Sequence, residues 1–193
     1  PAEELRAKLG LSGFTVGYVG RLVEEKGLRI LIEAAAGLDG DFQLLFLGRG
    51  PFRDDLARLV AAHNLDDRTV FIESVPHEQV PAYVNCLDCL VLPSLTTSGW
   101  KEQFGHVLIE AMACGVPVIG SDSGAIPEVI GDAGLIFPEG DTEQLRGRLV
   151  RLIGDAALRE RLSQAGRERV LAHYTDERIT EATWHVYQEV MKR

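Results

Sequence analysis

The sequence predicts an α/β domain built on a doubly wound parallel sheet. Short apolar segments alternate with segments of helical length along most of the 193 residues. Most of the apolar segments lack a clean alternation of polar and apolar positions, which is typical of strands buried on both faces. Strands that alternate with helices form βαβ units, and such units build a parallel sheet.

Each expected element follows from this alternation. The expected strands are Thr15–Val19, Phe42–Leu47, Thr69–Ile72, Cys89–Leu92, Val116–Gly120 and Leu135–Phe137. The helices expected between them are Gly27–Leu38, Arg53–His63, Glu78–Asn85, His106–Cys114 and Ile126–Ile130. Three more helices are expected to close the chain, namely Thr142–Ile153, Ala156–His173 and Asp176–Met191. Asp141 and Thr175 suit the N-caps of two of these helices.

Length and composition favour one domain. With 46% hydrophobic residues, 193 residues suffice for one well-packed core. Residues 13–193 are assigned to this domain, with terminal helices over 142–192, whereas residues 1–12 are polar and resemble a lead-in or linker. A net charge of −9 argues against a nucleic-acid partner, which would favour a basic surface.

The cysteines and the lengths of the apolar runs indicate the cellular compartment of the protein. The sequence has no long apolar run and no signal-like N-terminus, so neither a membrane span nor secretion is indicated. The three cysteines, Cys86, Cys89 and Cys114, form an odd and sparse set, which suggests a reducing cytoplasm. Cys86 and Cys89 have zinc-like spacing but no second pair, so we expect core packing there and no metal site.

Glycine, arginine and small polar residues follow most of the expected strands. Ligands of open parallel sheets bind outside the carboxyl ends of the strands, where these residues would gather. The segments concerned are Gly20-Arg21, Gly48-Arg49-Gly50, Ser74-Val75-Pro76, Pro93-Ser94 with Leu95–Gln103, and Ser121-Asp122-Ser123-Gly124.

A phosphate site is indicated after the first strand. Arg21 and Lys26 supply two cations beside a turn and a helix start, where backbone N–H groups and the helix dipole favour anions. The two cations could instead pair with Glu24, Glu25 or water. The chain has neither G-x-G-x-x-G after this strand nor G-x-x-x-x-G-K-[ST], which disfavours dinucleotide oxidoreductases and P-loop NTPases.

Two glutamates frame the segment between the fourth and fifth strands. Carboxylates accept hydrogen bonds from hydroxyl groups, so Glu102 and Glu110 suit a polyhydroxylated ligand such as a sugar or a ribose. Gly105 suggests that a helix begins between them. Glu102 would then lie on the incoming loop and Glu110 within the helix, both facing one crevice.

These motifs together resemble a known family. The ordered set is Gly20-Arg21-Leu22, Lys26-Gly27, Gly48-Arg49-Gly50-Pro51, Pro93-Ser94, Glu102-x7-Glu110, Gly115-Val116-Pro117-Val118-Ile119 and Glu128. It is similar to the C-terminal, nucleotide-sugar-binding half of a GT-B glycosyltransferase of the large retaining GT4-like family, whose domains are Rossmann-like. The resemblance covers residues 14–190, and the ordered set is specific to the family although each piece alone is weak.

The resemblance implies a role for each matching position. Arg21, Lys26 and Glu102 match the catalytic positions, of which the two cations hold the donor diphosphate and the glutamate contacts donor-sugar hydroxyls. Glu110 matches the residue that holds ribose hydroxyls. The other positions implied to bind the donor are Gly20, Arg49, Val75, Phe104, Gly105, His106 and Val107. For Arg49 a surface charge, and for His106 an ordinary helix-start residue, stay open as alternatives.

The resemblance also sets expectations for cofactors and partners. No catalytic metal or other cofactor is expected, because cationic side chains and helix ends replace it. The donor would be a UDP-, GDP- or ADP-sugar, and departures at Gln103 and Ser123 from the glycines common in the family leave its identity open.

The family enzyme has two domains, and this chain corresponds to one. We therefore expect an acceptor-binding N-terminal domain upstream, with peripheral membrane association through that domain as an option, and little transfer by this chain alone. Two other functions stay open. One is a non-catalytic nucleotide-sugar binding module. The other is a nucleotide-sugar epimerase-like enzyme, which would need its own acid/base pair in the cleft.

Overall fold

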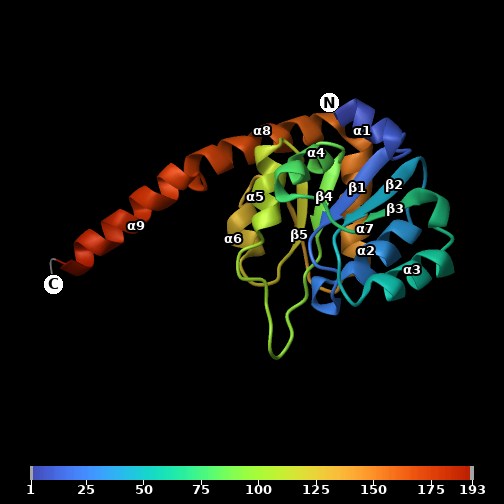
Figure 1. Cartoon of the computed structure of the whole chain (residues 1–193), viewed down its shortest axis with the longest axis horizontal. Coiled ribbons are helices and arrows are strands. Elements are labelled where there is room, and N and C mark those ends of the chain that lie inside the picture. The colour runs from blue at the N-terminus through green and yellow to red at the C-terminus, as the bar shows by residue number, and fades with distance from the viewer. Residues whose placement is uncertain (1, 192–193) are drawn as a thin grey trace.

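A six-stranded parallel sheet forms the centre of the molecule in a computed structural model that describes residues 2–191. The strand order is β3-β2-β1-β4-β5-β6, and every neighbouring pair is parallel (Figure 1). The strands are β1 Phe14–Val19, β2 Phe42–Leu47, β3 Thr69–Ile72, β4 Cys89–Leu92, β5 Val118–Ser121 and β6 Leu135–Phe137. The doubly wound parallel sheet predicted from the sequence is confirmed.

The sheet grows in opposite directions from its centre. From β1 the chain adds β2 and β3 on one side, and from β4 it adds β5 and β6 on the other. Because parallel crossovers are right-handed, the connecting helices of the two halves cover opposite faces of the sheet. The border between β1 and β4 is the topological switch point, where open α/β sheets bind their ligands.

The helices match the predicted segments closely. They are α1 Ala2–Lys8, α2 Leu28–Ala36, α3 Arg53–Ala62, α4 Val80–Val84, α5 His106–Ala113, α6 Ile126–Ile130, α7 Thr142–Gly154, α8 Ala156–His173 and α9 Asp176–Met191. The predicted caps are confirmed, since Asp141 accepts the N–H of Gln144 at 2.9 Å and Thr175 Oγ1 that of Arg178 at 3.3 Å. Asp155 also caps α8 by accepting the N–H of Leu158 at 2.8 Å, which the sequence reading missed.

Most boundaries agree with the prediction to within one or two residues, and two of the differences have a structural reason. The fifth strand begins at Val118 and not at Val116, because the N–H of Val116 donates to Ala111 O at 2.9 Å and so closes the end of α5. Pro117 follows and has no N–H to give to a ladder. The predicted helix Glu78–Asn85 is a 3-10 turn over His77–Gln79 followed by α4, in which Pro81 occupies the first turn.

The core lies on both faces of the sheet. All four residues of β4 are buried, and Tyr18, Phe42 and Phe46 are among the largest fully buried side chains. Cys86 and Cys89 belong to this core, as predicted. Burial raises the pKa of the Cys89 thiol.

The two ends of the chain differ in their packing. Arg6 on α1 donates to Cys86 O at 2.6 Å and to Gly13 O at 2.7 Å, so the lead-in helix is docked on the domain. In contrast, α9 projects away from it (Figure 1), and none of its described residues is buried. Over residues 2–191, no helix has both the length and the apolar character needed to cross a bilayer.

Candidate functional site

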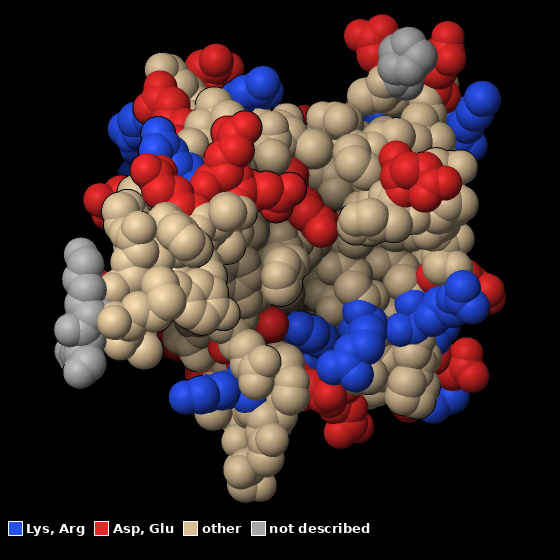
Figure 2. All heavy atoms as spheres, turned by 60° about the vertical axis from the view of Figure 1, so that its left-hand side comes forward, with Lys and Arg blue, Asp and Glu red and all other residues tan. Residues whose placement is uncertain are grey.

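Two adjoining hollows open at the carboxyl edge of the sheet. The first has a volume of about 370 Å³ and lies at the switch point, between the end of β1 and the loop that leads into α5. The second, of about 360 Å³, lies beside the ends of β2 and β3. Both are lined by Val19, Gly20 and Arg21, so together they form one groove along this edge. Figure 2 shows a hollow with Lys and Arg side chains gathered along one rim, although the net charge is −9.

Close backbone contact shapes the floor of the groove. A Cβ added to Gly48 would lie 1.8 Å from Gly20 O, and one added to Gly50 would lie 2.0 Å from Leu22 O. The N–H of Leu22 donates to Arg49 O at 2.8 Å. The loops after β1 and β2 therefore pack backbone to backbone, which only glycine permits at these positions.

The turn that carries Lys26 packs closely against the loop after β4. It ends a 3-10 turn over Glu24–Lys26, and the next residue, Gly27, has φ of 65°. A Cβ added to Gly27 would lie 1.9 Å from Pro93 O. The N–H of Leu95 donates to Glu25 O at 2.8 Å, which ties this turn to the loop after β4.

Lys26 and Glu102 form an ion pair across the switch point. Lys26 Nζ lies 2.5 Å from Glu102 Oε2, and Ser94 Oγ donates to the same oxygen at 2.8 Å. Only 14% of the Lys26 side chain and 9% of the Glu102 side chain is exposed. The alternative pairing of Lys26 with Glu24 or Glu25 is therefore wrong. Among the described residues no hydrogen bond reaches Glu102 Oε1, and none of their buried side-chain oxygens lacks a partner, so Oε1 faces the hollow.

The loop after β5 holds the backbone of Glu102. The N–H of Ala125 donates to Glu102 O at 3.0 Å. Gly124, at φ of 57°, packs so tightly there that an added Cβ would lie 1.9 Å from the same oxygen. The backbone of Glu102 therefore packs directly against Gly124, with no room for a side chain between them.

Arg21 and Arg49 lie on the surface of the groove. Arg21 is exposed, and within residues 2–191 its guanidinium makes no ion pair with a carboxylate. Its backbone is fixed by the Tyr18 hydroxyl, which donates to Arg21 O at 2.8 Å. Burial raises the pKa of Tyr18, and the charge of Glu102 raises it further, so the phenol stays a donor. Arg49 Nη2 donates to Ser74 Oγ at 2.5 Å beside Val75, in the second hollow.

The start of α5 forms a further wall of the first hollow. Gly105, at φ of 80°, ends the loop and makes no side-chain cap. Phe104, Gly105, His106 and Val107 all line the hollow. The first N–H groups of a helix have no partner within it, so this end of α5 presents donors and the positive end of the helix dipole.

Glu110 takes a different position. As predicted, Glu102 lies on the loop and Glu110 within α5. Glu110 is half-buried, yet it is not among the residues that line either hollow. Its negative charge adds to burial in raising the pKa of Cys114. The expectation that both glutamates face one crevice is thus supported for Glu102 alone, and the ribose role of Glu110 stays a prediction.

The sequence places Ser94, Trp100 and Lys101 in a segment at this edge but gives none of them a role, and it does not identify Tyr18 as a residue of the hollow. In the structure the ring centroid of Trp100 lies 4.8 Å from Lys26 Nζ. The sequence feature that could have identified Trp100 is its position two residues before Glu102.

Comparison with known proteins assigns the chain to a family. A family model described as glycosyl transferases group 1 matches residues 2–169. The chain belongs to this family. Among curated relatives, an alpha-D-kanosaminyltransferase of Streptomyces kanamyceticus is 32% identical over 97% of this chain and 49% of that protein. The chain spans about half the length of the curated relatives that it matches.

Solved structures agree with the group 1 assignment. Sucrose-phosphate synthase of Thermosynechococcus elongatus matches with a TM-score of 0.85 and 33% identity, over 100% of this chain and 49% of that one. A C-terminal domain of a glycosyl transferase group 1 protein from Francisella tularensis matches with a TM-score of 0.79 and 28% identity, over 91% of this chain and 94% of that one. The predicted resemblance to the C-terminal half of a GT-B enzyme is confirmed.

Proposed function

We propose that this chain is the donor-binding half of a glycosyltransferase that moves a hexose from a nucleoside diphosphate sugar to an acceptor. The observation that carries the proposal is the Lys26–Glu102 pair in the first hollow, at 2.5 Å, in a member of the group 1 family. Within one pair, a cation is available for a diphosphate and a carboxylate for sugar hydroxyls.

The diphosphate would lie between the loop after β1 and the start of α5. Arg21 and Lys26 line that part of the hollow, as do His106 and Val107 at the first turn of α5. Two cations and a helix N-terminus form an anion site. Arg21 is exposed and makes no ion pair among the described residues, so its guanidinium is available for two phosphate oxygens.

The sugar would lie against Glu102. One carboxylate oxygen is occupied by Lys26 and Ser94, and the other, Oε1, is available to accept a hydrogen bond from a hydroxyl group. Phe104 and Gly105 line the same hollow and limit the size of the sugar that fits.

The nucleoside would occupy the second hollow, next to Val75 and Arg49. Glu110 would hold the ribose, as the family resemblance implies. A solved structure with the same fold, Anabaena HepE in complex with UDP, has a TM-score of 0.89 at 22% identity. That a protein of this fold binds UDP supports a nucleotide in the groove.

The transfer would retain the configuration of the donor sugar, as in the family that the sequence resembles. Negative charge grows on the diphosphate as the glycosidic bond breaks, and cations aimed at that charge lower the barrier. Arg21 and Lys26 supply two such cations, which is why we propose a reaction without a metal cofactor. The acceptor would come from a further domain that faces this groove.

Titration calorimetry of this chain with UDP, GDP and ADP tests the proposal. We expect one diphosphate to bind clearly better than the other two, and Lys26→Ala to weaken that binding. Lys8→Ala removes the same charge from an exposed position on α1 and serves as the control. Absence of heat with all three nucleotides at millimolar concentration would contradict the proposal.

A further inference from the structure

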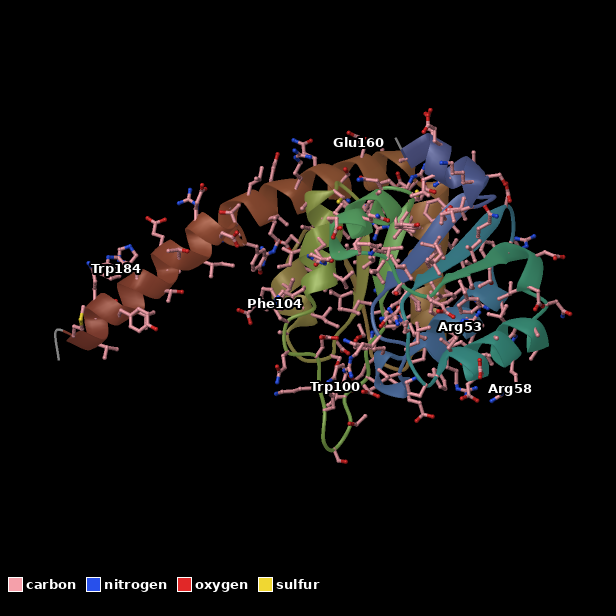
Figure 3. The ribbon with its side chains drawn as sticks, viewed as in Figure 1. Arg53, Arg58, Trp100, Phe104, Glu160 and Trp184 are labelled. Carbon is pink, nitrogen blue, oxygen red and sulfur yellow. The ribbon has the colours of Figure 1, made fainter. Side chains whose placement is uncertain are left out.

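Trp100 lies on the loop between β4 and α5, which projects from the carboxyl edge of the sheet (Figures 1 and 3). It is half-buried and lines the first hollow together with Lys26 and Glu102. The function proposed above assigns no role to Trp100.

The ammonium group of Lys26 lies between two partners. Glu102 Oε2 is 2.5 Å from Nζ, and the centroid of the Trp100 ring is 4.8 Å from the same atom. At this distance the negative face of an indole attracts a cation, and tryptophan does so more strongly than the other aromatic residues.

The loop that carries Trp100 is anchored at several points. The N–H of Thr96 donates to Glu139 Oε2 at 2.8 Å, and Thr96 Oγ1 lies 3.0 Å from Ser123 Oγ. The N–H of Thr97 donates to Trp100 O at 2.7 Å and closes a turn. These contacts fix the backbone of Trp100 beside the hollow, so the indole has a defined place next to Lys26.

We propose that Trp100 is a positioning residue for Lys26 and holds its ammonium in place for the diphosphate. An ammonium group has three N–H donors, and Glu102 accepts one of them. The indole face attracts the charge without providing a second strong acceptor. The remaining donors are therefore left for phosphate oxygens. This inference rests on the proposed function.

Two substitutions separate this role from simple coverage of the hollow. Trp100→Phe keeps an aromatic face, whereas Trp100→Leu keeps an apolar side chain without one. We expect Trp100→Leu to weaken diphosphate binding by about threefold to tenfold. Trp100→Phe should stay within about twofold of the unmodified chain, because a phenyl face also attracts a cation. Equal losses in both variants would show that the size of the side chain matters and would overturn the inference.

A double-mutant cycle with Lys26→Met tests whether the two residues act together. If the indole acts through the ammonium, Trp100→Leu should change diphosphate affinity little once Lys26 is replaced. The same loss in both backgrounds would contradict the inference. Thermal unfolding of each variant without ligand checks that the fold is retained.

A spectroscopic signal completes the test. The chain has two tryptophans, Trp100 and Trp184, and Trp184 lies out on α9 (Figure 3). In a Trp184→Phe chain all indole emission comes from Trp100. We expect UDP, GDP or ADP, whichever binds by calorimetry, to change this emission, and Lys26→Met to reduce the change. Calorimetric binding with unchanged Trp100 emission would overturn the inference and leave the donor site standing, whereas no binding at all would contradict the proposed function itself.

Discussion

At the scale of single residues, the site depends on one carboxylate that has two kinds of partner. Glu102 Oε2 is taken by Lys26 and Ser94, whereas Oε1 faces the hollow. Glu102→Ala would leave the Lys26 ammonium and the Ser94 hydroxyl without an acceptor. Glu102→Gln is a better probe, because its amide oxygen can still accept hydrogen bonds from both groups.

We expect Glu102→Gln to weaken binding of the nucleotide sugar by about tenfold, since a hydrogen bond to a charged group contributes roughly 1.5–3 kcal/mol. Binding of the free diphosphate should be unchanged or stronger, because Lys26 loses a competing anion. Glu110→Ala should weaken both ligands if Glu110 holds the ribose. Calorimetry with both ligands measures this, and identical effects of the two substitutions would show that the sugar side is misassigned.

The cations should matter more for the reaction than for binding. In a full-length enzyme, Arg21→Ala and Lys26→Ala should lower kcat as well as donor affinity, because charge on the leaving diphosphate is greatest in the transition state. NMR-monitored transfer measures the rate and the anomeric configuration of the product together. A product of inverted configuration would contradict the retaining mechanism, and an unchanged kcat would remove both residues from the catalytic role.

At the scale of elements, the sequence predicted the sheet and helices well because their apolar periods are strong. It failed at one strand boundary and where distant segments meet. After the end of α5 the N–H of Val116 donates back to Ala111 O, and this moves the start of β5 to Val118. Likewise, no local pattern shows that Lys26 pairs with Glu102, which is 76 residues away in sequence. The sequence assigns no role to Trp100, because its partner Lys26 comes from the other half of the sheet.

Glycines of the site can be tested in matched pairs. Gly124 and Gly140 both have positive φ, 57° and 81°, so alanine is strained at either position. Only at Gly124 would the new Cβ meet a neighbour, Glu102 O at 1.9 Å, whereas Gly140 has open space. We expect Gly124→Ala to weaken nucleotide-sugar binding by shifting Glu102, and Gly140→Ala to leave it unchanged. Comparable affinity of the two variants would show that the position of Glu102 does not depend on this contact.

At the scale of the whole molecule, α9 projects from the domain, and none of its residues from Asp176 to Met191 is buried. Its exposed apolar side chains are Ile179, Trp184, Val186, Tyr187, Val190 and Met191. An exposed apolar surface of this kind marks an interaction site. The chain spans about half of its relatives, so the surface that α9 would cover belongs to a further domain in our proposal.

Hydrogen exchange can test this placement of α9. In a protein that also contains the other domain, amides of Asp176–Met191 should exchange more slowly than in this chain alone. Amides of α7, which buries Leu145, Leu149 and Leu152 within this domain, serve as the internal control and should change little. Equal exchange of α9 in the two proteins would exclude a stable contact there.

The isolated chain should show no sugar transfer, and robust transfer by it would contradict the two-domain proposal.

The pair at the switch point joins two stretches of chain that belong to opposite wings of the sheet. The nucleobase would be recognised by residues 20–80, on the wing of β1 to β3, and the sugar by residues 94–107, on the wing that begins with β4. Mutations within residues 94–107 can therefore alter the sugar preference while the residues that contact the nucleobase stay unchanged. Grafting residues 94–107 from a relative that uses another sugar should transfer that preference with the nucleobase unchanged, which competition between nucleotide sugars would reveal.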